Sequence, residues 1–581
     1  MLTQLQIVLL LVVASAFATP TVTVLNGTCW YTTAQLHDSG INVPFLKQDI
    51  FRGMPFAQQS RFEQATPMTE TWKGTRDATQ PGVTCAGFGT NPREHWLVGE
   101  DCLNLNVVRP EGSYPGLDLP VLRHGRSDAK QSVNSGGGFR QGSNRDPEFN
   151  SSFMVQTSQE IAHPLITVEI NYRVSAFGFA ASTELGGSGA LNIGLQDQRH
   201  ALRWIHENIR AFGGDPNKVT IWGESAGAQS VALQLMAYGG DTQGLFRSAI
   251  MASGSFFGFG QHRLADAQLV YNNMTNATGC ADAVDTLQCL KELPFSVINA
   301  TAYGQNEGQA FGPVVDGDFF RTYPFKAFEQ GRLPPVNIIT GCNSDEGLTW
   351  ASVFGNGIAA NTTAELAAVL EVGLHMNGTL ADQLLDLYPF NAPAPPYSVP
   401  LDYQWVSTMA KIGLSAGAQT RRLYGLAGDK AVMAGRRKTA SEWDKFGGLA
   451  YSFRFDTDSS RFPIVVTPGL GPGFAQHGAE LSWQFRLPYI APTPYPPLPN
   501  ITSMRDLSYA MQATWASFAA TGSPNHHGVS WVPYWPAYSN GSQNMVFNAT
   551  LSDSLNLHVE DDDFRRQGIA WMNDKWALLD K

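Results

Sequence analysis

Charge is scarce in this chain, and no basic segment stands out. Only 15% of the 581 residues are charged, and the net charge is −11. A surface of this sign repels phosphate groups, so nucleic acid and anionic membrane surfaces are excluded as partners. The metal-ligand spacings C-x-x-C and H-E-x-x-H are also missing. We therefore expect neither a metal site nor a cofactor.

Linkers and internal repeats are missing too. The sequence has no long Ser/Gly-rich or charged low-complexity run, and strand-like and helix-like patterns alternate along it. Length alone would favour three or four domains. Because no boundary can be placed between them, the sequence instead predicts one large α/β domain with long insertions.

A long apolar run is present only at the N-terminus, over Ile7–Phe17. It is too short to span a bilayer. It ends in Ala16-Phe17-Ala18, the small-x-small arrangement at which signal peptidase cleaves. The sequence therefore predicts a signal peptide over residues 1–18. Residues 19–581 would form a secreted chain with no stable membrane insertion.

Acceptor sequons for N-linked glycans agree with secretion. We expect glycans on some of these sites and none on others. The ten sequons start at Asn26, Asn150, Asn273, Asn276, Asn299, Asn361, Asn377, Asn500, Asn540 and Asn548.

Cysteine is rare, with six residues in the whole chain. In an oxidising compartment these become candidates for disulfides. Cys85 and Cys102 are 17 positions apart and Cys280 and Cys289 are 9 apart, spacings that suit local loops. Two cysteines, Cys29 and Cys342, are left over. We interpret them as buried free thiols, with a long-range bridge as the alternative.

A G-x-S-x-G motif is centred on Ser225, between Gly223 and Gly227. The residues before it, Val219–Trp222, are β-branched and aromatic and predict a buried strand. The residues after it, Ala226–Tyr238, are good helix formers. A serine on so tight a strand-to-helix turn is held clear of the sheet, over the N-terminus of the helix. The motif therefore predicts a nucleophilic serine, whereas a bare glycine-flanked turn would carry no chemistry.

A serine hydroxyl is a weak nucleophile and needs a base that is itself oriented by an acid. In an α/β-hydrolase sheet the chain order is serine, acid, histidine, which restricts the base to histidines after Ser225. We favour His477, because the glycine-rich segment Gly473–Glu480 lets it reach over the edge of a sheet. The other candidates in the chain are His375, His526, His527 and His558.

The acid should follow the carboxyl end of a strand, where open parallel sheets place their sites. Val336–Gly341 is such a predicted strand, and Asp345 and Glu346 follow it directly. We take Glu346 as the candidate and Asp345 as its competitor.

Ten segments in one order make the chain resemble the type-B carboxylesterase and lipase family, which includes the cholinesterases and many secreted fungal esterases. The likeness runs nearly end to end. The segments are Phe51–Ala57, Glu100–Asn106, Asn171–Val174, Gly194–Gln198, Phe212–Pro216, Gly223–Gly227, Asn343–Gly347, His477–Glu480, Met511–Trp515 and Gly522–Asn525.

This resemblance implies an α/β-hydrolase fold, with a large and mostly parallel central sheet flanked by helices. It implies Ser225 as nucleophile, His477 as general base and then acid, and Glu346 as the orienting carboxylate. The family's oxyanion hole would be formed here by the backbone N–H groups of Gly137, Gly138 and Ala226.

The same resemblance implies two disulfides and two buried ion pairs. The disulfides would join Cys85 to Cys102 and Cys280 to Cys289. The ion pairs would join Arg61 to Glu100 and Arg173 to Asp197, with a structural role.

The chain departs from the family over residues 123–135, just before the oxyanion glycines. Leu119–Leu122 starts an apolar strand, but the polar and charged residues Arg123–Ser135 replace its continuation. A central parallel strand should be a nearly continuous apolar run. One interpretation is a mis-spliced or mistranslated stretch in a damaged enzyme. The other is a genuine surface insertion that leaves the strand shortened.

The sequence therefore predicts a secreted serine carboxylesterase that acts on a small-molecule ester. The loop between Cys85 and Cys102 encloses only 16 residues, whereas interfacial lipases of the family have a longer lid there. The alternatives are a lipase on longer-chain acyl esters, and a catalytically impaired or non-catalytic binding protein on the same scaffold.

Overall fold

The structure is a computed structural model of the chain. It describes residues 21–25, 27–30, 32–33, 46–87, 96–125, 137–146, 149–258, 262–305, 310–347, 349–350, 360–373, 376–390, 417–457, 475–486, 501–550 and 552–579. The predicted signal peptide, residues 1–18, lies outside these ranges.

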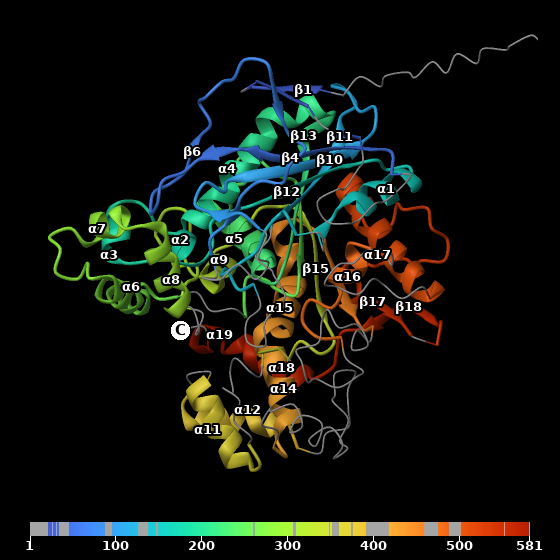
Figure 1. Cartoon of the computed structure of the whole chain (residues 1–581). Helices are drawn as coiled ribbons and strands as arrows, with labels where there is room; N and C mark the ends of the chain where they lie inside the picture. Colours follow the sequence, from blue (N-terminus) through green and yellow to red (C-terminus); the bar gives the residue numbers. More distant parts are fainter. Residues whose placement is uncertain are drawn as a thin grey trace, which may run out of the picture.

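A mixed sheet occupies the centre of the molecule (Figure 1), and within the described residues it has eleven strands. Its middle strands, from β12 to β17, run parallel to one another, and antiparallel strands complete both edges. In sheet order the strands are β18 (Leu555–Asp561), β17 (Gln543–Ala549), β16 (Ala450–Phe455), β15 (Asn337–Asn343), β14 (Ser248–Ala252), β13 (Gly214–Glu224), β11 (Leu119–Gly125), β12 (Ile166–Ile170), β10 (Asn104–Pro110), β4 (Gln48–Pro55) and β3 (Thr32–Thr33).

Short strands form three further sheets near the N-terminal part. They are β1 (Thr21–Val24), β2 (Gly27–Trp30) and β7 (Thr75–Asp77) in one sheet, β5 (Ala57–Gln58) with β6 (Thr66–Pro67), and β8 (Thr84–Cys85) with β9 (Val98–Gly99).

Helices surround the central sheet. The described α-helices are α1 (Ser152–Glu160), α2 (Ser175–Phe179), α3 (Thr183–Gly187), α4 (Ile193–Asn208), α5 (Ala226–Gly240), α6 (Leu264–Thr278), α7 (Thr286–Glu292), α8 (Phe295–Gln305), α9 (Pro324–Glu329), α11 (Thr363–Gly373), α12 (Gly378–Leu387), α14 (Thr420–Gly428), α15 (Ala434–Glu442), α16 (Leu481–Gln484), α17 (Thr502–Thr521), α18 (Arg566–Asp574) and α19 (Trp576–Leu579).

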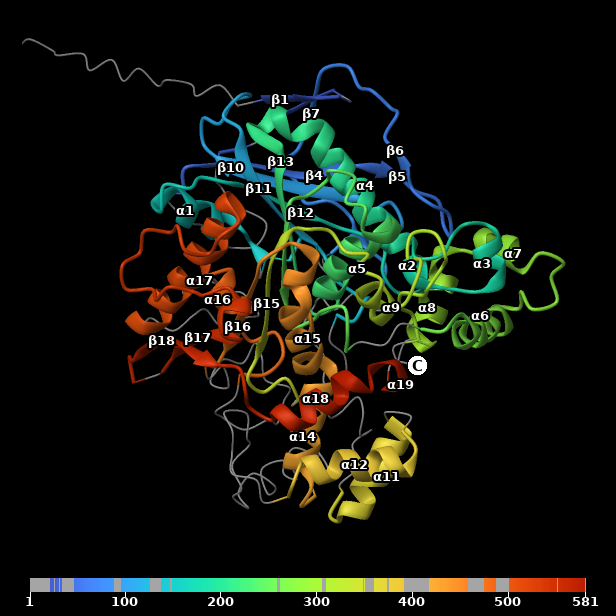
Figure 2. The same ribbon diagram turned by 180° about the vertical axis from the view of Figure 1, so that it is seen from behind.

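Both faces of the central strands are buried, and alternate residues enter two separate hydrophobic cores. On β13, Ile221 packs into the core that also contains residues of α4 and α5. Its neighbour Trp222 packs into the core shared with α1, α16 and α17. Figure 1 and its reverse view in Figure 2 show these two groups of helices on opposite sides of the sheet. This double burial explains why the predicted strand reads as a continuous apolar run, and the α/β prediction with a mostly parallel sheet is confirmed.

The structure corrects the predicted interruption after Leu122. Strand β11 continues to Gly125, and Arg123 and His124 stay in register with Ile221 and Trp222 of β13. Ending the strand early would leave backbone groups of both neighbouring strands unpaired. Pairing therefore continues, although it buries Arg123 and His124 to 1% and 4% exposure. The remainder of the atypical segment, residues 126–135, lies outside the described ranges.

The two buried polar side chains of β11 meet different surroundings. His124 lies among aromatic rings, with centroids 4.7 Å from Trp222 and 5.3 Å from Phe485. Burial lowers the pKa of the Arg123 guanidinium to about 10. Its Nε and Nη2 have no hydrogen-bond partner among the described residues.

Candidate active site

Ser225 sits on the turn between β13 and α5, as the motif predicts. Its backbone has φ 55° and ψ −126°, an unusual conformation for a residue other than glycine. The turn is so tight that a Cβ on Gly223 would lie 2.2 Å from the carbonyl oxygen of Gly227. Glycine is therefore required at position 223, and the strain places the serine hydroxyl beyond the end of the strand.

His477 joins Ser225 to Glu346. Its Nε2 lies 2.7 Å from the Ser225 hydroxyl oxygen, and its Nδ1 lies 2.6 Å from Oε2 of Glu346. A carboxylate can only accept a hydrogen bond, so Nδ1 carries the proton and Nε2 is left to accept from the hydroxyl. Three side chains predicted from distant parts of the sequence thus lie in one hydrogen-bonded chain.

Glu346 is fully buried in the turn after β15. Its second oxygen, Oε1, accepts the backbone N–H of Asn343 at 2.8 Å. The competitor Asp345 takes another partner, because its Oδ2 accepts the backbone N–H of Ala475 at 2.9 Å. Burial raises the pKa of the Asp345 carboxyl to about 8.

Two further side chains lie beside the imidazole of His477. Oε1 of Glu224, the residue before the serine, is 3.7 Å from Nε2 of His477. The indole of Trp350 meets the imidazole edge to face, with 5.1 Å between ring centroids. Neither residue has a role among the predictions made from the sequence. Adjacency to Ser225 could have singled out Glu224, whereas nothing in the local pattern singles out Trp350.

The predicted oxyanion glycines lie in a turn that begins at residue 137. The carbonyl oxygen of Gly137 accepts the backbone N–H of Arg140 at 2.5 Å. Phe139 fixes the turn, because its carbonyl accepts the N–H of Ser175 at 2.6 Å and its ring packs 4.7 Å from that of Phe179. Gly138 has φ 44°, within the region that favours glycine.

Ala226 is the first residue of α5. The first N–H groups of a helix have no acceptor within it, which leaves that of Ala226 able to bind an oxyanion. A joint role of Gly137, Gly138 and Ala226 as donors stays a prediction.

Both expected ion pairs are present. Arg61 and Glu100 are 2.6 Å apart, and Arg173 and Asp197 are also 2.6 Å apart. The second pair is the more deeply buried, with side-chain exposures of 4% and 0%. Removing one partner would strand a buried charge at a cost of about 3–5 kcal/mol.

Both expected disulfides are present, between Cys85 and Cys102 and between Cys280 and Cys289. Cys342 is a buried free thiol, as expected. The side chain of Cys29 lies outside the described part of the chain.

Two of the remaining candidate histidines bond to neighbouring residues, and a third, His558, lies on β18. His526 Nδ1 contacts the hydroxyl of Thr521 at 3.1 Å, and His527 Nδ1 accepts the N–H of Val529. His375 lies outside the described residues. Across the described ranges, no cluster of three or more His, Cys, Asp or Glu residues could hold a metal ion.

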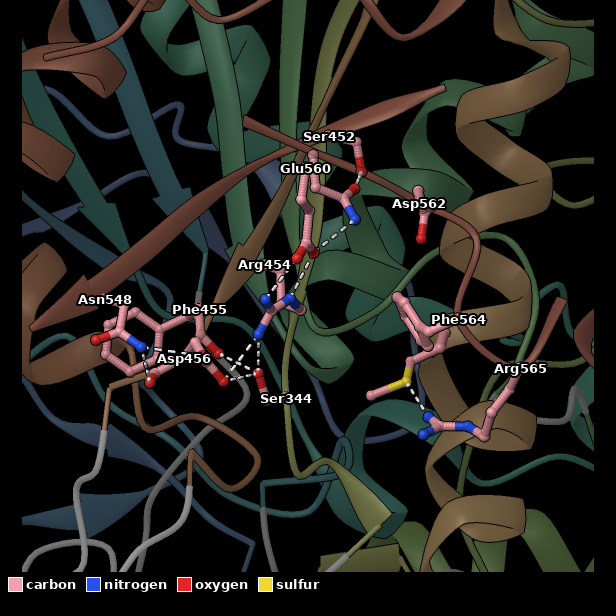
Figure 3. A network of polar contacts seen from close by, with 12 residues as sticks. Ser344, Ser452, Arg454, Phe455, Asp456, Asn548, Glu560, Asp562, Phe564 and Arg565 are labelled. Atoms are coloured by element: carbon pink, nitrogen blue, oxygen red, sulfur yellow. Dashed lines mark hydrogen bonds and ion pairs between the residues drawn. The ribbon is translucent and has the colours of Figure 1, made fainter. Parts of the chain in front are cut away.

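A polar network braces the end of the strand that leads to Glu346 (Figure 3). Arg454 of β16 donates from Nε and Nη2 to both oxygens of Glu560, at 2.6 Å each, and from Nη1 to the hydroxyl of Ser344 at 2.7 Å. Asp456 accepts from Ser344 and, at 2.9 Å, from the side-chain amide of Asn548. The network ties strands β16, β17 and β18 to the turn that carries the acid.

No helix in the described ranges combines the length and the apolar character that a membrane span requires.

Comparisons with known proteins place the chain in a family. The carboxylesterase family model matches residues 38–565. Lipase 4 of Diutina rugosa is 29% identical over 97% of this chain and 97% of its own length. A secreted triacylglycerol lipase of Gibberella zeae is 31% identical over 81% of this chain and 74% of its own.

The crystal structure of EstA from Aspergillus niger is similar in fold, with a TM-score of 0.77 at 24% identity, and the match covers 97% of this chain and 99% of that one. The sheet and helices of this chain therefore match the α/β-hydrolase fold that the family resemblance implied. Because the family model spans nearly the whole chain, the protein belongs to the carboxylesterase family and is a carboxylic ester hydrolase.

Proposed function

We propose that this hydrolase works through an acyl-serine intermediate on Ser225, with His477 as base and Glu346 as the orienting acid. The observation that carries the proposal is the pair of short contacts from one imidazole to the hydroxyl and to the carboxylate.

The first half of the reaction acylates the enzyme. Nε2 of His477 takes the proton of the Ser225 hydroxyl as its oxygen attacks the carbonyl carbon of the ester. Glu346 stabilises the imidazolium that forms. When the tetrahedral intermediate collapses, the imidazolium returns the proton to the leaving alcohol.

The second half repeats these steps with water. His477 removes a proton from the water, which attacks the acyl carbon, and Ser225 leaves with that proton. In both halves negative charge develops on the former carbonyl oxygen. The N–H groups of Gly137, Gly138 and Ala226 are the proposed donors to it, and losing one such donor costs about 100- to 1000-fold in rate.

Covalent labelling tests the nucleophile. The secreted protein is treated with paraoxon, digested and mapped by mass spectrometry, beside a Ser225→Ala control. One phosphoryl adduct on Ser225, absent from the control, together with turnover of p-nitrophenyl butyrate, is the expected result. A folded wild-type protein with neither adduct nor turnover would instead be a non-catalytic or impaired member of the family.

A lipase on longer-chain esters is the second candidate, favoured by the names of the relatives. The short loop between Cys85 and Cys102 favours an esterase on soluble esters. Rates on tributyrin measured across its solubility limit separate the two. An esterase saturates below that limit, whereas a rise in rate when the emulsion forms would favour the lipase.

We further propose that the chain is exported with loss of residues 1–18 and carries N-linked glycans. The secreted relative supports an extracellular location. N-terminal sequencing of protein from the culture medium should begin near Thr19. An intact N-terminus at Met1 would contradict this assignment.

A further inference from the structure

The turn that carries the acid and the turn that carries the base are joined by more than the contact between Glu346 and His477. The backbone N–H of Asp345 donates to the carbonyl of Ala475 at 2.9 Å, and the N–H of Ala475 donates back to the Asp345 carboxyl at 2.9 Å. These bonds fix one edge of the contact between the turns. Asn343 fixes the other edge of this contact.

Asn343, the last residue of β15, is fully buried. Its backbone N–H donates to Oε1 of Glu346 at 2.8 Å. Its side-chain amide donates to the carbonyl oxygen of Gln476 at 2.7 Å and to Oε2 of Glu480 at 2.5 Å. One residue therefore bonds to the acid through its backbone and, through its side chain, to both ends of the segment that holds His477.

The chemistry of these contacts requires an amide at position 343. Both partners of the side chain, the carbonyl of Gln476 and the carboxylate of Glu480, are hydrogen-bond acceptors. An aspartate has nearly the same shape, but its carboxylate would face these two oxygens without a proton to share. In a fully buried site that conflict is costly, because no solvent screens it.

Glu480 is the matching partner on the base side. It is fully buried, lies three residues after His477 and precedes α16. Its bond to Asn343 therefore holds the far end of the turn, while the bond to Gln476 holds the residue next to the base.

We infer that Asn343 is a positioning residue of the hydrolase, which sets the distance between Glu346 and His477 through its bonds to Gln476 and Glu480. This inference rests on the proposed function. Its consequence for rate is large, because a displacement of about 1 Å at a reacting group can cost on the order of 100-fold.

The test replaces Asn343 with its isostere. Asn343→Asp keeps the backbone N–H to Glu346 but repels Gln476 and Glu480. We expect kcat for p-nitrophenyl butyrate to fall about 10- to 100-fold while KM changes by no more than about 2-fold, because the substrate site is untouched. Thermal unfolding of each variant reports whether the fold is kept.

Asn337→Asp is the matched control. Asn337 is the first residue of the same strand, and its side chain also bonds to two other segments, at Gly522 and Leu449. A fall in stability is expected for both variants, but a fall in kcat only for the change at position 343.

Exchanging the amide and the carboxylate between positions 343 and 480 should rescue the activity of Asn343→Asp. In Asn343→Asp combined with Glu480→Gln the donor and the acceptor trade places, so the hydrogen bond between these two positions is restored. We expect kcat of the double variant to recover by about 5-fold or more over Asn343→Asp. If Asn343→Asp does not fold, Asn343→Ala, which adds no charge, takes its place with the same expected loss of kcat.

Two outcomes would overturn the inference: a folded variant at position 343 with wild-type kcat, or an equal loss of kcat in the Asn337 control. A failure of the proposed function is distinguishable, because the wild-type protein itself would then lack turnover and the paraoxon adduct.

Discussion

Asp345 and Glu346 are neighbours in the chain, yet only the carboxylate of Glu346 reaches His477. Oε2 of Glu346 lies 2.6 Å from Nδ1 of His477, while Oδ2 of Asp345 accepts the backbone N–H of Ala475. In the proposed mechanism the Glu346 carboxylate orients the base, whereas the Asp345 carboxyl holds the segment that carries His477.

This difference predicts unequal effects of two conservative changes. Glu346→Gln removes the negative charge that orients the imidazole, and kcat should fall on the order of 1000-fold or more. Asp345→Asn keeps an oxygen that can accept from Ala475, and kcat should fall by less than about 10-fold. Steady-state kinetics on p-nitrophenyl butyrate compares them. A larger loss in Asp345→Asn than in Glu346→Gln would reassign the acid.

Arg123→Leu should stabilise the protein. The guanidinium is buried at 1% exposure, and burial lowers its pKa from 12.5 to about 10, which corresponds to about 3 kcal/mol. A leucine at this position would extend the apolar strand. We expect the free energy of unfolding to rise by about 1–3 kcal/mol, measured by denaturant titration.

Arg109→Leu is the matched control for that change. Arg109 is also buried in the sheet, but it pairs with Asp49 at 2.9 Å. Removing it takes away the cationic partner of the buried Asp49 carboxylate, so the free energy of unfolding should fall by about 3–5 kcal/mol. Destabilisation in both variants would mean that Arg123 has a structural role.

The stability of the folded state should fall in acid because the Asp562 carboxylate becomes protonated. Burial disfavours the charged form of this carboxyl, but Arg436 and Arg437 outweigh burial and hold its pKa well below the ordinary value. A carboxyl whose pKa is lower in the folded than in the unfolded state stabilises the folded state at every pH above its unfolded-state pKa. That contribution is therefore complete at neutral pH and is lost as the pH falls below about 3.8.

The measurement is the unfolding temperature between pH 7 and pH 3. Asp562→Asn should lower it at pH 7 and flatten its decline toward acid pH. Asp561→Asn, at the exposed neighbouring position, should leave the curve unchanged. A curve for Asp562→Asn that runs parallel to the wild type would contradict this origin of acid sensitivity.

Glycan occupancy should follow the freedom of each asparagine side chain. Asn273 and Asn276 are exposed on α6 and should be modified. Nδ2 of Asn548 donates to the backbone carbonyl of Asp456 at 3.0 Å and to its carboxylate at 2.9 Å, so this site should stay bare. Glycopeptide mapping after enzymatic release in H₂¹⁸O checks both statements, and label on Asn548 would contradict the second.

Local sequence rules predicted the strand-to-helix turn at Ser225 well, because the cause of this turn is local. Gly223 must be glycine for lack of room beside Gly227, and a strand before and a helix after Ser225 follow from residue type. The glycine-rich segment around His477 and the strand before Glu346 pointed to these two candidates, but the choice among the candidates needed the chain order of the fold and the family resemblance.

The wrong end predicted for β11 and the missed bond between Asn343 and Glu480 each have a specific cause. The rule for apolar strands weighs side chains alone, so it ended β11 at Leu122, whereas hydrogen bonding by the strands on both sides continued it through Arg123. The bond between Asn343 and Glu480 joins residues 137 positions apart, a distance at which no periodicity operates. Only the folded chain brings those two turns together.

The path of the chain through the sheet also governs when activity can arise during biosynthesis. The proposed base, His477, lies 252 positions after Ser225 in the chain. During translation the ribosome therefore synthesises Ser225 well before His477, and the serine hydroxyl has no base until the C-terminal part of the chain is made. A chain that ends before His477 would therefore lack the base that the proposed mechanism requires, and it should not hydrolyse esters.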